Sequence, residues 1–147
     1  MDDDGSHPAI LISNRQDIPI DVDRLILLAR ETLEGEGLRI DAVELSVSFV
    51  DDQEMADLHV RYMDEPGPTD VLSFPLDDVD DRGVRLLGDV VIAPAVAARN
   101  HPSDPAAELR LLLVHGILHV LGYDHQEETE RADMWARQER YSGVRVP

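Results

Sequence analysis

Apolar and polar residues alternate most clearly in residues 43–49, where every second side chain is apolar. A period of two is typical of a β-strand with one buried face. Residues 9–13 and 71–74 are shorter apolar stretches that also predict strands, and residues 87–92 predict a fourth. We expect the last two strands to pair as a long hairpin around a polar loop at residues 76–83.

Apolar residues recur every three or four positions in two further segments, which is the spacing of a helix with one buried face. In residues 22–33 this pattern follows Asp21, whose side chain can cap a helix, and it stops before a Gly-Glu-Gly sequence. A second helix is expected to begin at Asp51 or Asp52 and to end before the Pro-Gly-Pro sequence at residues 66–68.

The most apolar segment, residues 105–121, predicts a long helix that is apolar on nearly all sides and therefore central and buried. Ser103 or Asp104 can cap it, and Pro105 suits its first turn. A short helix is expected at 93–100, and a charged amphipathic helix from Glu127 to Tyr141. No internal repeat or linker interrupts the pattern, so we expect one domain over residues 1–147.

Composition narrows the class of protein. A length of 147 residues favours a single domain, and the lack of cysteine excludes disulfides and thiolate metal sites. The first residues are acidic, where a signal peptide would be basic. No apolar run approaches the roughly 18 residues that a membrane helix needs. We therefore expect a cytoplasmic protein that does not bind membranes.

The chain is strongly acidic, with a formal net charge of −18, and its thirteen basic residues are all arginine. A field of this sign repels nucleic acid, whose binding normally depends on neutralising phosphates. Any role on RNA therefore requires a local cationic site, such as a metal ion with a few arginines.

Three of the six histidines lie within eleven residues, at positions 115, 119 and 125. His115 and His119 are four residues apart, so on a helix their Cβ atoms lie about 5–6 Å apart on one face. Gly122 can adopt the left-handed conformation that ends a helix, which lets His125 return toward the pair. Three protein ligands and a water form the usual catalytic zinc site. A histidine pair on a helix can also be merely structural, but the third histidine favours metal binding.

The same spacing reproduces the metzincin protease pattern H-E-x-x-H-x-x-G-x-x-H with one change. Gly116 stands where a metzincin has the glutamate that acts as general base. The three metal ligands are kept and the proton shuttle of the peptidase is lost. The pattern therefore predicts a zinc hydrolase with a different chemistry, and a metallopeptidase is the alternative.

Three stretches together resemble the YbeY family of bacterial ribosomal-RNA maturation endoribonucleases. They are Pro-Thr-Asp-Val-Leu-Ser-Phe-Pro at 68–75, Leu-Gly-Asp-Val-Val-Ile at 87–92, and the histidine segment at 115–125. The family pattern H-G-x-L-H-x-x-G-Y-D-H is matched at every fixed position of the last stretch. The resemblance runs from about residue 45 to 139, roughly two thirds of the chain.

The resemblance implies an α+β fold in which a small, mostly antiparallel sheet packs with several helices. It implies one Zn²⁺ per chain, held by His115, His119 and His125 at the end of the central helix. It also implies cleavage of single-stranded RNA during ribosomal RNA processing and ribosome quality control. Ribosomal RNA, and ribosomal small-subunit proteins, are the partners expected of such an enzyme.

One segment departs from the family pattern. The family commonly has L-N-x-x-Y-R before the Pro-Thr-Asp turn, where this chain has Leu-His-Val-Arg-Tyr-Met at residues 58–63. His59 replaces the asparagine, and Met63 stands in the place of a functionally important arginine. Arg61 is a candidate substitute, although residues two apart do not share a helix face. His59 is either a wall of the cleft or a half-exposed helix residue.

The general base is not fixed by the pattern. Three neutral imidazoles leave the full charge of zinc in place, and a water in the fourth position would have a pKa of about 7. Asp124, Asp70 and Asp89 could act as bases. Asp124 could equally orient a ligand histidine, Asp70 could serve a turn, and Asp89 could accept a hydrogen bond at a strand end.

A second alternative is a non-catalytic ribosome assembly factor that binds ribosomal proteins through its acidic surface and uses zinc for its fold. A fourth protein ligand that closes the zinc site would favour that reading, whereas an open fourth position favours catalysis.

We predict one tightly bound zinc ion per chain, because the histidine spacing matches a three-ligand site. Elemental analysis of protein purified without a histidine tag should show near-equimolar metal. His115→Ala or His119→Ala should weaken zinc binding most, because each removes half of the pair on the helix. A metal content near zero that added zinc does not restore would contradict the site.

Overall fold

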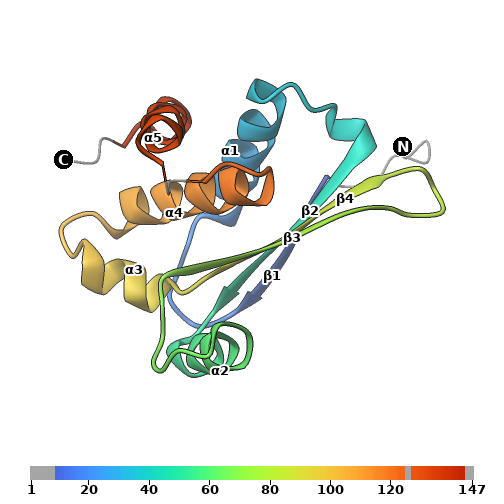
Figure 1. The fold of residues 1–147 in the computed structure, drawn as a ribbon. Coiled ribbons are helices and arrows are strands. Elements are labelled where there is room, and N and C mark those ends of the chain that lie inside the picture. The colour runs from blue at the N-terminus through green and yellow to red at the C-terminus, as the bar shows by residue number, and fades with distance from the viewer. Residues whose placement is uncertain (1–8, 125–126, 145–147) are drawn as a thin grey trace.

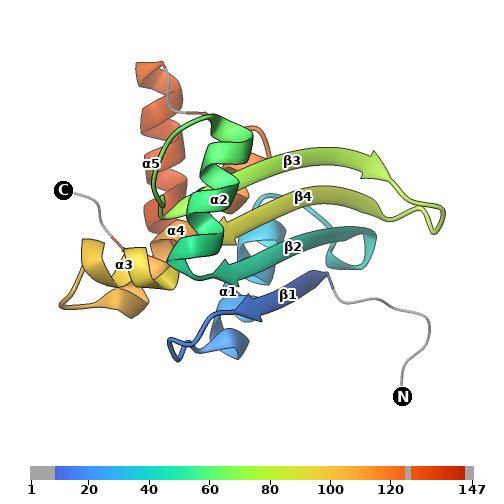
Figure 2. The ribbon, with the colours of Figure 1, turned by 90° about the horizontal axis from the view of Figure 1, so that it is seen from below.

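Four strands form one mixed sheet in the computed structural model, which describes residues 9–124 and 127–144. The strands are β1 (Ile10–Arg15), β2 (Val43–Val50), β3 (Val71–Val79) and β4 (Arg85–Ile92). Their order across the sheet is β1-β2-β4-β3, as Figure 2 shows. β2 runs parallel to both β1 and β4, and only the edge pair β3–β4 is antiparallel.

The expectation of a mostly antiparallel sheet is therefore wrong, although the α+β class and all four strands are confirmed. The reason lies in the connections. Helix α1 (Val22–Gly35) carries the chain from β1 back to the start of β2, and α2 (Asp52–Met63) follows β2. The α1 crossover returns the chain to the same end of the sheet, which makes β1 and β2 parallel. α2 leads instead to β3, which runs opposite to β2, and the turn after β3 brings β4 back parallel to β2. Only the short turn between β3 and β4 permits an antiparallel pair.

The helices divide unequally between the two faces of the sheet (Figure 1). α1, α4 (Pro105–Val120) and α5 (Glu128–Ser142) lie on one side, with α4 in contact with β3, β4, α1 and α5. α3 (Pro94–Asn100) packs against α4, and α2 crosses the opposite face. The predicted central helix is thus confirmed as α4. Within the described residues, no helix is long and apolar enough to cross a membrane.

β2 has the burial pattern that its sequence predicts. Its alternate apolar side chains face the helices and are buried, whereas the serines between them are half-buried: the buried set is Val43, Leu45, Val47 and Phe49. Beneath α2, on the other face, a smaller apolar cluster forms from Val50, Met55, Leu72, Val91 and Ala93. The main core therefore lies between the sheet and α1, α4 and α5.

Three aspartates cap helices at the positions that the sequence suggests. The Asp21 side chain accepts a hydrogen bond from the Arg24 amide at 3.1 Å. At α2 the cap is Asp51, and at α4 it is Asp104, whose carboxylate accepts from the amide of Ala107 at 3.1 Å. Each such cap is worth about 1 kcal/mol. The α4 cap fixes where the helix begins and hence which face carries His115.

The β3–β4 hairpin is longer than its apolar pattern indicates. β3 continues through Val79, so the expected loop at 76–83 becomes a shorter connection at residues 80–84. Asp80 closes this turn, because its carboxylate accepts hydrogen bonds from the amides of Arg82 and Val84. Asp77 pairs with Arg85 across the hairpin at 2.9 Å. The acidic residues here belong to the hairpin structure, which their charge alone did not suggest.

We predict that Gly88→Ala destabilises the hairpin strongly. Gly88 has φ +136° in β4, and an added Cβ would overlap the carbonyl oxygen of Phe74 on β3. Backbone strain and overpacking each cost about 1–3 kcal/mol, so urea unfolding should show a loss of at least about 2 kcal/mol. Gly83→Ala is the matched control, since φ is +80° there but no atom lies within 4 Å of the added Cβ. Equal losses in the two variants would contradict the close approach.

Candidate metal centre

His115 and His119 lie on one face of α4, as their spacing predicts. Their ring centroids are 4.6 Å apart and the ring planes meet at 74°, an edge-on arrangement. Both side chains are half-buried, while Leu113 and Ile117 on the same helix are fully buried in the core. The packed helix therefore holds the two imidazoles close together on a rigid support.

The two histidines open into a cleft of about 360 Å³ between α4, β3 and the end of α2. Its lining comprises Met63, Val71, Leu72, Ser73, Pro75, His115 and His119. Apart from the imidazoles and the hydroxyl of Ser73, the walls are apolar. A ligand bound in this cleft would therefore find its polar contacts concentrated at the histidines.

A glutamine from α5 supports His115 from behind. Gln138 is buried, and its Oε1 atom lies 2.7 Å from Nδ1 of His115. The ring of Trp135, one turn earlier on α5, lies 6.1 Å from the His115 ring. Sequence reasoning missed Gln138. The available signal was its position four residues after Met134 and four before Ser142, which places a polar side chain on the buried face of α5.

The third predicted ligand, His125, lies outside the described residues. Among the residues that are described, no three potential metal ligands gather at one point. The chain does turn where expected: α4 ends at Val120, and Gly122 has φ +105°. The third ligand thus stays a prediction, and the described geometry is that of the pair and the turn that follows it.

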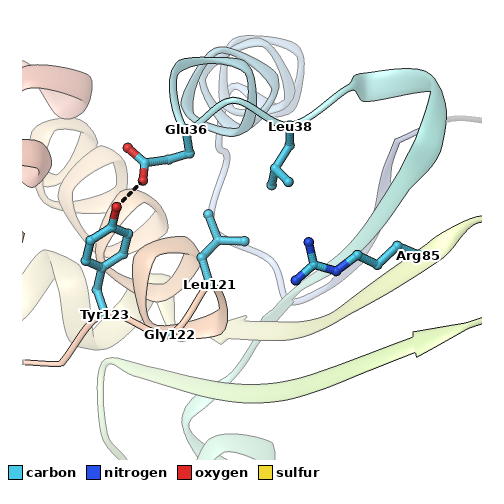
Figure 3. A pocket seen from close by; sticks show the side chains of 6 residues that line it. All are labelled: Glu36, Leu38, Arg85, Leu121, Gly122 and Tyr123. Carbon is cyan, nitrogen blue, oxygen red and sulfur yellow. Dashed lines mark hydrogen bonds between the residues drawn. The ribbon is translucent and has the colours of Figure 1, made fainter.

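A buried carboxylate fixes this turn to the rest of the fold. Glu36, just after α1, accepts hydrogen bonds from the hydroxyls of Tyr123 at 2.6 Å and Tyr141 at 2.5 Å. It also pairs with Arg137 at 2.8 Å, and its side chain is only 5% exposed. Figure 3 shows Glu36 meeting Tyr123 at one end of a pocket. The contact anchors the chain two residues before position 125.

That pocket has a volume of about 280 Å³ and lies beyond the end of α4. It is lined by Glu36, Leu38, Arg85, Leu121, Gly122 and Tyr123. Its charged groups are already paired, Glu36 with Arg137 and Arg85 with Asp77. Its charged lining residues are therefore not available to a ligand, and the pocket lies beside the anchored turn.

Gly116 is packed against the sheet. An added Cβ at this position would lie 2.6 Å from Cγ1 of Val90 and 3.3 Å from Oγ of Ser73. The Ser73 hydroxyl also donates a hydrogen bond to the Gly116 carbonyl at 3.1 Å. A glutamate side chain has no room there, so this position cannot supply the base of a metzincin peptidase without moving α4 from the sheet.

The other candidate residues lie in different places. Asp124 is half-buried in the turn after α4, and Arg61 is exposed on the last turn of α2. Asp89 is exposed on the face of the sheet opposite α4, where it borders a pocket with Arg15. Asp70 lies before β3, and its carboxylate accepts a hydrogen bond from Asn100 at 3.3 Å. Of these, only Asp124 belongs to the segment that carries the histidines.

Comparison with known proteins gives a consistent result. Residues 11–143 match the sequence model of the family described as Endoribonuclease YbeY. The chain belongs to the YbeY family. The protein named Endoribonuclease YbeY from Thermobifida fusca is 47% identical over 142 residues, which cover 88% of this chain and 89% of the relative. Its namesake from Acidothermus cellulolyticus is 48% identical over 141 residues, 86% of this chain and 85% of the relative.

A solved relative supports the fold. The solution structure of a Thermotoga maritima protein is similar with a TM-score of 0.58 and 28% sequence identity. The similarity covers 90% of this chain and 86% of the other. The resemblance noted from three short motifs therefore extends over nearly the whole chain.

This YbeY-family member has a histidine pair that suits zinc. Two imidazoles on adjacent helical turns provide nitrogen ligands of the type zinc prefers, and the contact of His115 with the buried Gln138 is made through Nδ1. No described carboxylate lines the cleft with them. The chemistry of the described residues is thus compatible with the zinc site that the family resemblance implies.

The segment that departs from the family pattern has a clear structural role at one position. His59 Nδ1 donates a hydrogen bond to the Gly67 carbonyl at 2.8 Å, and its Nε2 lies 3.2 Å from a Glu65 carboxylate oxygen. His59 therefore holds the turn after α2. Met63, at the position of the family arginine, lines the cleft, whereas Arg61 is not among the lining residues.

The hydrogen bonds to Glu36 shift the pKa values of the groups involved. Burial alone would raise the pKa of the Glu36 carboxyl, but the hydrogen bonds from Tyr123, Tyr141 and Arg137 outweigh it and hold that pKa below its usual value. Burial, followed by the bond to Glu36, raises the pKa of the Tyr123 hydroxyl to about 12. The Tyr123 hydroxyl therefore stays protonated and donates its hydrogen bond to Glu36 across the neutral range.

We predict that Glu36→Gln lowers stability at neutral pH and that the loss shrinks in acid. The pKa of Glu36 in the folded state lies below its unfolded value of about 4.3. Its ionised form therefore stabilises the fold above about pH 4, and this stabilisation disappears as the pH falls through the folded pKa. Urea unfolding from pH 7 to pH 3 measures the difference between wild type and variant.

Glu34→Gln is the matched control, because Glu34 is an exposed residue on the last turn of α1, two positions before Glu36. It should change stability little at any pH. A Glu36→Gln difference that stays constant from pH 7 to pH 3 would show that the ionised carboxylate is not what stabilises the turn.

Proposed function

We propose that this chain is a zinc-dependent endoribonuclease that cleaves single-stranded RNA during ribosomal RNA maturation and ribosome quality control. The observation that carries the proposal is the edge-on His115–His119 pair opening into a cleft, in a chain whose relatives are named endoribonucleases. His115, His119 and His125 would hold one zinc ion. Bound zinc would supply a Lewis acid for a phosphate and an activated water.

The size and lining of the cleft favour a single strand. At about 360 Å³ it can admit part of an unstacked strand, whereas a duplex keeps its bases stacked inside a much wider helix. The apolar side chains of Met63, Val71 and Pro75 offer surfaces against which an unstacked base can pack. Such contacts do not depend on base sequence, because every base has an apolar face.

The acidic surface supports a local mode of RNA binding. With a net charge of −18, the chain gains little from long-range attraction to phosphates. Binding would rest on the metal and on contacts in the cleft, so few counterions would be released and affinity would depend weakly on salt. The same surface suits basic partners, among which ribosomal small-subunit proteins are the ones the proposed role brings close.

A peptidase role is less well supported, because the chain has only one of the two features that it requires. The histidine pair is present, but Gly116 abuts Val90 and leaves no space for the glutamate base of that class. The cleavage assay should therefore include an unstructured protein such as casein, which we expect to remain intact.

We predict that wild-type protein cleaves single-stranded RNA in a metal-dependent manner and that His115→Ala abolishes the cleavage. The variant removes one ligand while the buried residues of α4 keep the helix in place. Losses of a metal ligand should reduce the rate at least about 100-fold. Fluorescently labelled single-stranded and duplex RNA provide the substrates, and circular dichroism checks the fold of the variant.

His101→Ala is the matched control, since His101 lies in the loop before α4 and outside the cleft. It should cleave as wild type does. Equal cleavage by His115→Ala would assign the activity to a contaminating ribonuclease, and casein degradation by wild type but not His115→Ala would favour the peptidase.

A further inference from the structure

We propose that Gln138 is a positioning residue that sets the tautomer of His115 and thereby directs its Nε2 atom to the metal. This inference rests on the proposed zinc site. Gln138 is only 3% exposed, and its Oε1 atom lies 2.7 Å from Nδ1 of His115. Its side chain is thus a buried polar group whose hydrogen-bonding partner is a metal-ligand candidate from another helix.

The atom of the Gln138 amide that faces His115 determines which ring nitrogen carries the hydrogen. An amide oxygen only accepts hydrogen bonds, so Nδ1 of His115 must carry the hydrogen and donate it. In a neutral imidazole the other nitrogen, Nε2, then has the free lone pair that a metal requires. If the amide NH₂ faced Nδ1 instead, the hydrogen would move to Nε2 and that atom could not bind a metal.

The position of Gln138 along α5 is itself fixed. Arg137 and Tyr141, which flank it in the sequence, both bind the buried carboxylate of Glu36. Ser142 donates a hydrogen bond from its hydroxyl to the Gln138 carbonyl at 2.6 Å, within the buried face of the helix. Two side chains of α5, one on each side of Gln138, are therefore attached to Glu36 at the end of α1, which limits the sliding of α5 along α4.

A neutral partner has a specific advantage at this buried position. A carboxylate would also accept from Nδ1, but burying a charge without an ionic partner is costly. Glutamine orients the ring without adding charge beside the metal. Partners of this kind typically contribute a factor of about 10–100 to metal affinity, and they act by holding the ligand rather than by touching the metal.

The test compares Gln138→Leu, which keeps the size of the side chain and loses the acceptor, with Gln138→Glu, which keeps an acceptor. Histidine-ring ¹⁵N NMR of the metal-free protein reads the tautomer of His115 directly. Chelator competition then measures zinc affinity. Gln53→Leu, at an exposed position on α2, is the matched control. Gln138→Met serves as a second acceptor-free variant should the leucine variant fold poorly.

We expect His115 in the wild type to carry its hydrogen on Nδ1, and both acceptor-free variants to lose this preference. Zinc affinity should fall about 10–100-fold in those variants, whereas Gln138→Glu should regain most of the wild-type affinity. A purely structural role for Gln138 would lower thermal stability without changing the tautomer, and that result would overturn the inference.

The outcomes also separate the inference from the proposed function. If the wild type binds zinc, and the Gln138→Leu and Gln138→Met variants keep its His115 tautomer and its zinc affinity, the inference alone is overturned. A wild-type His115 with its hydrogen on Nε2 would do the same. Failure of the wild-type chain to bind zinc would overturn the proposed function, and this inference with it.

Discussion

The close packing of α4 on the sheet is the contact on which the other features depend. At Gly116 the helix backbone approaches Val90 and Ser73 so closely that no side chain fits between them. This approach holds α4 against β3, so that His115 and His119, on either side of Gly116 in the sequence, open into the cleft beside that strand. It also leaves the opposite side of α4 free to pack against α1 and α5. One glycine therefore serves both the core and the candidate metal centre, and the missing peptidase base is a consequence of this packing.

Much of this arrangement could be predicted from local patterns. The alternation in β2, the apolar run of α4 and the three aspartate caps each depend on neighbouring residues, so the sequence carries them directly. The spacing of His115 and His119 likewise specifies a shared helix face. Sheet direction was mistaken because it was inferred from a resemblance, while the helix between β1 and β2 already favours a parallel pair.

The interactions that escaped prediction join residues far apart in the sequence. Gln138 meets His115 across 23 residues, and Glu36 meets Tyr123, Arg137 and Tyr141 across 87 to 105 residues. Nothing in the local pattern around Glu36 distinguishes it from the many other acidic residues of this chain. A buried carboxylate is recognisable only once tertiary structure supplies its donors, whereas a polar residue on the buried face of α5 was a weaker but readable signal.

The large sequence separation of the Glu36 contacts affects the order in which the structure forms during synthesis. A ribosome makes the chain from its N-terminus, so the Glu36 carboxylate emerges long before the tyrosines and the arginine that neutralise and bind it. Closing such distant pairs is slow compared with forming helices or hairpins. Helices α1 and α4 can form early, but the support behind His115 exists only after α5 has been synthesised and has docked. The contact between Gln138 and His115 therefore forms late, after the helix that carries the histidine pair.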